Sequence, residues 1–128
     1  MAAFHKDGRD TATPEALVSL LLKIWRTEAL SPAGTAMLPD FMHRCETGRQ
    51  RLEGGLPRGT RVAHETGTLR PNVANGIGII ELPGGAGHVI VAVLIKETAQ
   101  HLRAQERAIA AISRAAYDNF ESTAGRTN

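Results

Sequence analysis

Seven consecutive apolar residues, Val89 to Ile95, set the tightest limit on how this chain can fold. A half-exposed strand alternates apolar and polar residues, whereas a continuous apolar run of this length is typical of a strand covered on both faces. The preceding residues, Pro83 to Gly87, have the glycine and proline content of a turn. We therefore expect an antiparallel hairpin of strands Gly76 to Leu82 and His88 to Lys96, with the second strand central in its sheet.

Three helices are expected from start signals and apolar spacing. A hydroxyl residue followed by proline begins the first at Thr13 and the second at Ser31, because the hydroxyl caps free backbone amides and proline suits the first helical turn. Pro39 lies inside the second helix and removes a backbone donor, so we expect a kink or break there and a helix end at Gly48. The third helix is defined by apolar residues that share one helical face, namely Leu102, Ile109, Ile112, Ala116 and Phe120.

The order of these elements predicts the fold class. A further strand, Thr60 to His64, follows a glycine-rich loop, so the chain reads as helix, helix, three antiparallel strands and helix. This order predicts an α+β fold in which a three-stranded antiparallel sheet is flanked by helices. We expect one domain over residues 13–121, preceded by a polar segment, 1–12, and followed by a flexible tail, 122–128.

Composition argues against several classes of protein. The 15 basic and 13 acidic residues leave a net charge of only +2, and aromatic residues make up 4% of the chain, so no nucleic-acid partner is expected. Cys45 is the single cysteine and the histidines lack the spacing of a zinc motif, so we expect no disulfide, metal or cofactor. The chain has no long apolar stretch and no signal-peptide pattern, which predicts a soluble protein with no membrane contact.

A short motif at the end of the first expected strand indicates a family. His64 to Thr68 reads HETGT, which resembles the KTG box that lines the active site of β-lactamases and penicillin-binding proteins. Neighbouring segments match the family as well: DTATP at Asp10 to Pro14, LSPA at Leu30 to Ala33, and the whole run from Thr47 to Thr68. From Lys6 to Phe120 the chain therefore resembles the C-terminal half of a class A β-lactamase-like serine hydrolase, from the end of the omega loop to the last helix.

The resemblance implies part of the β-lactamase/transpeptidase-like fold and a set of substrate-binding residues. Gly67 would let a ligand lie along the strand, and the backbone N–H of Thr68 would supply one oxyanion-hole donor. The hydroxyls of Thr66 and Thr68 would bind the substrate carboxylate, with Thr47 and Arg51 assisting. The full implied set is Thr47, Arg51, Glu65, Thr66, Gly67 and Thr68.

Two departures from the family pattern argue against independent activity. Glu65 stands at the lysine position of the box, and two like charges about 4 Å apart repel by about 4 kcal/mol at an effective dielectric constant of about 20. A substrate carboxylate would meet this repulsion unless Glu65 is protonated or Arg51 compensates. The chain also has no SxxK motif, no SDN triplet and no match to the general-base glutamate, so we assign no catalytic residue and expect no hydrolysis by the chain alone.

Three functions remain open at this stage. The chain is an inactive C-terminal half of a β-lactamase-like protein, a complementing subunit that binds β-lactams only with its missing half, or a non-enzymatic dimeric interaction module. The family fold takes two further strands from its N-terminal part, so the edge of Val89 to Ile95 is expected to pair. We favour a second copy of the chain as the partner. The alternatives are a separate N-terminal half, or a monomer whose own helices cover the edge. Family members are usually exported, but the compartment of this chain stays open.

Overall fold

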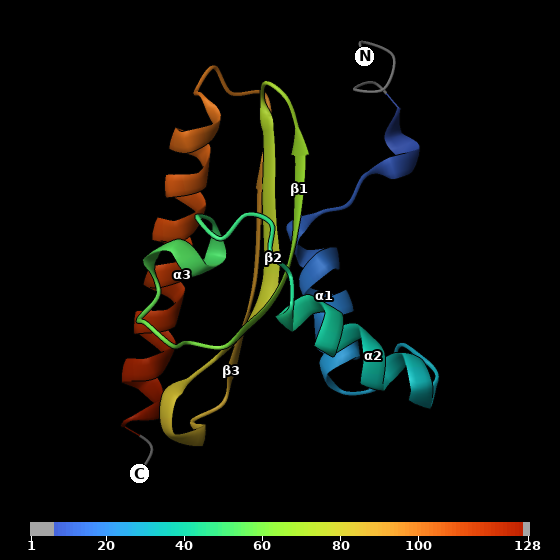
Figure 1. The fold of residues 1–128 in the computed structure, drawn as a ribbon, viewed down its shortest axis with the longest axis vertical. Coiled ribbons are helices and arrows are strands. Elements are labelled where there is room, and N and C mark those ends of the chain that lie inside the picture. The colour runs from blue at the N-terminus through green and yellow to red at the C-terminus, as the bar shows by residue number, and fades with distance from the viewer. Residues whose placement is uncertain (1–6, 127–128) are drawn as a thin grey trace.

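The computed structural model describes residues 7–126, which form three layers (Figure 1). Residues 1–6 of the expected polar segment and 127–128 of the expected tail lie outside the described residues. A three-stranded antiparallel sheet is the middle layer. The helices that cover one face are α1 (Pro14–Trp25) and α2 (Pro32–His43), and the helix on the other face is α3 (Leu102–Ala124). The expected α+β class is therefore confirmed.

The sheet contains strands β1 (Val62–Leu69), β2 (Val73–Glu81) and β3 (His88–Ile95), in the order β1-β2-β3. Ile80 in β2 pairs with Val62 on one side and Val89 on the other. β1 continues to Leu69 rather than ending at His64, because its pairing with β2 is unbroken up to the connecting turn. The HETGT motif therefore lies inside a strand, not at its end.

Within the described chain β3 is an edge strand and β2 is the strand with two neighbours. The central position predicted from the apolar run is therefore wrong for this chain, whereas the unpaired edge expected without the family's two further strands is observed. The apolar run has another cause. Val89, Val91 and Val93 belong to the core on the α3 side, whereas Ile90 packs against the core formed with α1 and α2. Helices thus cover both faces of β3 (Figure 1), and a strand covered on both faces is apolar throughout whether or not it has two hydrogen-bonded neighbours.

Both predicted helix starts are confirmed. The Thr13 hydroxyl accepts the backbone N–H of Ala16 at 3.1 Å, and the Ser31 hydroxyl accepts that of Gly34 at 3.2 Å. These hydrogen bonds satisfy amides that a helix leaves free in its first turn.

The second helix differs from its prediction in two respects. Pro39 lies within α2 without breaking it, and the helix ends at His43 rather than at Gly48. Leu38 and Met42 pack against the sheet on either side of the proline, and this tertiary packing offsets the hydrogen bond that proline removes.

The last helix is longer than its apolar spacing predicted. α3 runs to Ala124, so residues 122–124 of the expected tail are helical. The Ser122 and Thr123 hydroxyls donate to the Asn119 carbonyl at 2.9 and 2.8 Å, which satisfies an acceptor in the final turn. The domain limits at residues 13 and 121 stay a prediction.

Each face of the sheet carries its own hydrophobic core. Leu52, Ile80 and Ile109 are fully buried on the α3 side, and Leu21 and Ala63 are buried on the α1 and α2 side. Large apolar side chains nevertheless remain exposed in both helical layers and in the loop before α2: Leu20, Trp25, Leu30, Met37, Phe41, Ile112 and Phe120. In residues 7–126 no helix combines the length and the apolar character needed to cross a membrane.

Candidate functional site

The loop after α2 brings Thr47 against the second half of β1. The hydroxyl oxygens of Thr47 and Thr66 lie 2.7 Å apart and form a hydrogen bond, and the Cys45 sulfur lies 3.3 Å from the Thr47 hydroxyl. Gly48 makes this approach possible: its φ is +61°, and a Cβ at this position would lie 2.6 Å from the Thr66 methyl carbon. The structure therefore brings together two of the residues that the family resemblance singled out.

Arg51 is buried and joins this loop to both strands of the β1-β2 hairpin. Its Nη1 donates to the carbonyls of Gly67, at 2.9 Å, and Asn75, at 2.7 Å, while Nη2 donates to the Thr68 hydroxyl at 2.5 Å. The Nε atom lies 3.5 Å from Glu106 Oε1, which places a carboxylate of α3 beside the guanidinium. The buried cation therefore contacts the exposed end of β1 through its hydrogen bond to the Thr68 hydroxyl.

Glu65 does not share this environment. Successive side chains of a strand alternate between its two faces, so Thr66 and Thr68 point to the α3 side with Arg51 whereas Glu65 points to the side of α1 and α2. Glu65 is exposed and forms no ion pair with any residue between 7 and 126. Arg51 and Glu65 thus lie on opposite faces of the sheet. No direct contact allows Arg51 to neutralise the negative charge of Glu65.

His64 is a buried neighbour of the site that sequence reasoning treated only as part of the motif. Its side chain is 1% exposed, and Nε2 lies 3.3 Å from Glu53 Oε1 without the geometry of a hydrogen bond. Gly78 is its partner in β2, where a Cβ would lie 2.6 Å from the Ala63 carbonyl oxygen and 2.9 Å from Leu52. His64 lies two residues after the apolar Val62 and therefore on the same face of β1, and this spacing was the signal that could have identified the histidine as part of the core.

The groups at the end of β1 can recognise a ligand through hydrogen bonds. The threonine hydroxyls and the free edge of a strand can donate hydrogen bonds to an anionic or acyl group, and the buried Arg51 guanidinium donates to one of these hydroxyls, that of Thr68. Within the described part of the chain, the Thr47 and Thr66 hydroxyls contact no imidazole, amine or carboxylate that could take a proton from them. Residues 7–126 also contain no cluster of three or more histidine, cysteine, aspartate or glutamate side chains placed to hold a metal ion.

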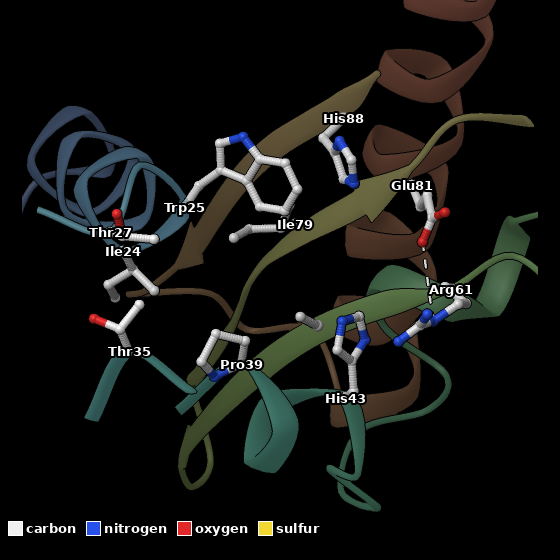
Figure 2. Close-up of a pocket in the computed structure, with 11 residues that line it drawn as sticks. Ile24, Trp25, Thr27, Thr35, Pro39, His43, Arg61, Ile79, Glu81 and His88 are labelled. Carbon is white, nitrogen blue, oxygen red and sulfur yellow. Dashed lines mark ion pairs between the residues drawn. The ribbon is translucent and has the colours of Figure 1, made fainter. Parts of the chain in front are cut away.

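A second candidate site is a cavity of about 270 Å³ on the opposite face of the sheet (Figure 2). Its lining comes from α1, α2, the turn between them and the sheet: Ile24, Trp25, Thr27, Thr35, Pro39, His43, Arg61, Ala63, Ile79, Glu81 and His88. The Trp25 and His88 rings are 3.9 Å apart between centroids. Sequence reasoning missed this cavity, because segments distant in the chain form it and no local motif marks them.

Comparison with known proteins places this chain and its fold among the class A β-lactamases. The chain belongs to the β-lactamase enzyme family, whose model matches residues 1–120. It is 39% identical over 103 residues to the extended-spectrum β-lactamase PER-1 of Pseudomonas aeruginosa, and 37% identical over 84 residues to a β-lactamase of Mycobacterium tuberculosis (strain ATCC 25177 / H37Ra). The expected family is thereby confirmed.

Solved structures agree with the sequence relatives. The TLA-3 extended-spectrum β-lactamase superposes with a TM-score of 0.83 at 35% identity, and a β-lactamase from Xanthomonas campestris pv. campestris with 0.81 at 30% identity. These matches cover 92% and 88% of this chain, but only 46% and 42% of those proteins. The PER-1 and M. tuberculosis matches cover 77% and 66% of this chain, but only 33% and 27% of those enzymes. The chain therefore spans less than half the length of these relatives.

Proposed function

We propose that this chain is the C-terminal portion of a class A β-lactamase-like protein and supplies the substrate-recognition edge of an acyl-transfer site. The carrying observation is that Thr47, Arg51, Thr66 and Thr68 form hydrogen-bonded pairs side by side along β1. Within residues 7–126 β1 pairs only with β2, so its other edge offers backbone N–H and C=O groups to an extended ligand. A carboxylate-bearing acyl compound such as a β-lactam suits this combination of donors.

We further propose that the chain does not hydrolyse β-lactams by itself. Acyl transfer by a hydroxyl needs an adjacent base, and among the described residues the hydroxyls at β1 bond only to one another, to Cys45 and to Arg51. The sequence also lacks the SxxK and SDN motifs of the family. Glu65 stands where the family has lysine, so the chain lacks the cation that the family places on this strand.

A partner polypeptide is part of this proposal. β3 has one free edge within residues 7–126, and an unpaired strand edge promotes association. The exposed apolar side chains lie in both helical layers, with Leu20 and Phe41 on one side of the sheet and Ile112 and Phe120 on the other. A homodimer formed through β3 alone would leave most of them exposed, so this distribution favours a longer polypeptide that covers both layers, such as the N-terminal half.

The activity proposal is tested with nitrocefin and intact-protein mass spectrometry. The purified chain is expected to show no turnover and no covalent adduct with benzylpenicillin, because it presents no activated nucleophile. A penicilloyl adduct on the isolated chain would contradict the proposal. Addition of a separately produced N-terminal part of the PER-1 enzyme is expected to restore turnover that rises with Glu65→Lys and is unchanged by Glu121→Lys, an exposed position on α3.

The partner proposal is tested by light scattering and amide hydrogen exchange. The informative amides are those of β3 that do not bond to β2. We expect these amides to exchange fast in the isolated chain at low concentration and to become protected when the N-terminal part is added. A concentration-dependent dimer that protects the same amides would instead support the homodimer, and a monomer that protects them at every concentration would rule out both partners.

A further inference from the structure

The cavity on the α1 and α2 side of the sheet has the construction of a small-molecule site. Ala63 and Ile79 are buried and form an apolar floor, and Ile24 and Pro39 add apolar walls from the two helices. Its volume of about 270 Å³ lies just below the range of about 300–1,000 Å³ typical of small-molecule pockets. This volume therefore limits the ligand to a single ring or two fused rings.

An aromatic wall selects for a flat ligand. The Trp25 indole is 48% exposed and lies against the His88 imidazole, with 3.9 Å between ring centroids and 38° between ring planes. Figure 2 shows the two rings along one side of the cavity, with Pro39 and His43 across from them. A planar ring inserted between these sides would stack on an aromatic pair that is already in place.

The polar rim of the cavity offers a donor and an acceptor next to each other. Arg61 directly precedes β1 and Glu81 is the last residue of β2, and the Glu81 N–H donates to the Arg61 carbonyl at 3.0 Å. Their side chains are 3.9 Å apart between Nε and Oε2, which is too far for a direct hydrogen bond. A ligand with neighbouring C=O and N–H groups can accept from the guanidinium and donate to the carboxylate simultaneously.

The charge of the rim decides between ligand classes. An anion would be attracted by Arg61 and repelled by Glu81, and a cation the reverse, so neither gains a net advantage from the pair. An uncharged cyclic amide uses both groups. We propose that this cavity is a binding site for a flat, uncharged heteroaromatic compound of one or two rings whose adjacent C=O and N–H groups bridge Arg61 and Glu81 while its face stacks on Trp25. This site is separate from the acyl-recognition edge, and its test does not depend on the function proposed for that edge.

The single tryptophan of the chain makes the test direct, because the indole N–H of Trp25 gives one unique signal in a ¹H–¹⁵N spectrum. The probe is isoquinolin-1(2H)-one, and the control ligand is its N-methyl derivative, which has the same ring but no N–H donor. We expect a saturable shift of the indole signal, with a Kd of about 1 mM or tighter for the probe. The N-methyl compound is expected to bind about tenfold more weakly, since it leaves Glu81 without its hydrogen bond.

Variants locate the interaction. Arg61→Ala and Glu81→Ala are each expected to weaken the probe about tenfold, whereas Arg103→Ala and Glu121→Ala, at exposed positions on α3, leave its affinity unchanged. A fingerprint spectrum that matches the parent away from the cavity confirms that each variant is folded. The proposal is overturned if the indole signal does not saturate up to the solubility limit, if the N-methyl compound binds equally well, or if the two rim variants bind like the α3 variants.

Discussion

Replacement of Arg51 by methionine tests whether the recognition edge depends on the buried guanidinium. Arg51→Met keeps much of the aliphatic stem but removes donors to the Gly67 and Asn75 carbonyls and to the Thr68 hydroxyl. It also leaves Glu106, whose side chain is 15% exposed, without the guanidinium 3.5 Å away.

The magnitude follows from these contacts. Hydrogen bonds to a charged group contribute about 1.5–3 kcal/mol each, but the strand acceptors can regain part of this from water because they lie near the surface. Removal of one partner of a buried charge pair costs about 3–5 kcal/mol. We take the lower end and expect the free energy of unfolding to fall by about 3 kcal/mol, which is a large share of the about 5–15 kcal/mol that a domain usually has.

Urea unfolding followed by circular dichroism measures this loss. With a denaturant slope of about 2 kcal/mol per M, the midpoint is expected to fall by about 1.5 M. Arg44→Met is the matched control, because Arg44 is exposed and pairs with Asp40 on the surface of α2; its expected cost is below about 1 kcal/mol.

A second variant separates the charge from the packing. Arg51→Met combined with Glu106→Met is expected to recover at least about 1 kcal/mol relative to Arg51→Met alone, because no carboxylate is then left without a cation. The reasoning would be refuted if Arg51→Met cost no more than Arg44→Met, or if the double variant were less stable than the single one.

Two further substitutions test the packing beneath the site. Ser113→Ala removes the buried hydroxyl that donates to the Leu52 carbonyl at 2.8 Å, and we expect a loss of about 1–2 kcal/mol in urea unfolding; no measurable change would show that this carbonyl is satisfied in another way. Gly78→Ala places a methyl group 2.6 Å from the Ala63 carbonyl oxygen, so the strands must separate, and we expect a loss of about 2–3 kcal/mol in thermal unfolding, contradicted by an unchanged melting temperature.

Features that depend on neighbouring residues were predictable from the sequence. The starts of α1 and α2 follow from Thr13 and Ser31, whose hydroxyls bond amides three residues away. The β2-β3 hairpin follows from the glycine-rich turn between two apolar runs. The HETGT motif with its flanking segments was sufficient to identify the family, because a gap-free match over such a length depends only on the order of residues.

Features that depend on contacts between distant segments were decided by the tertiary structure. The edge position of β3 follows from strand pairing, which an apolar run cannot reveal, since helices on both faces produce the same pattern. The separation of Arg51 from Glu65 follows from which residues of β1 face each side of the sheet. The cavity beside Trp25 forms where two helices meet the sheet. Hydrogen bonds within a few residues are set by local chemistry, whereas strand order, burial and cavities arise only when the chain has brought its remote parts together.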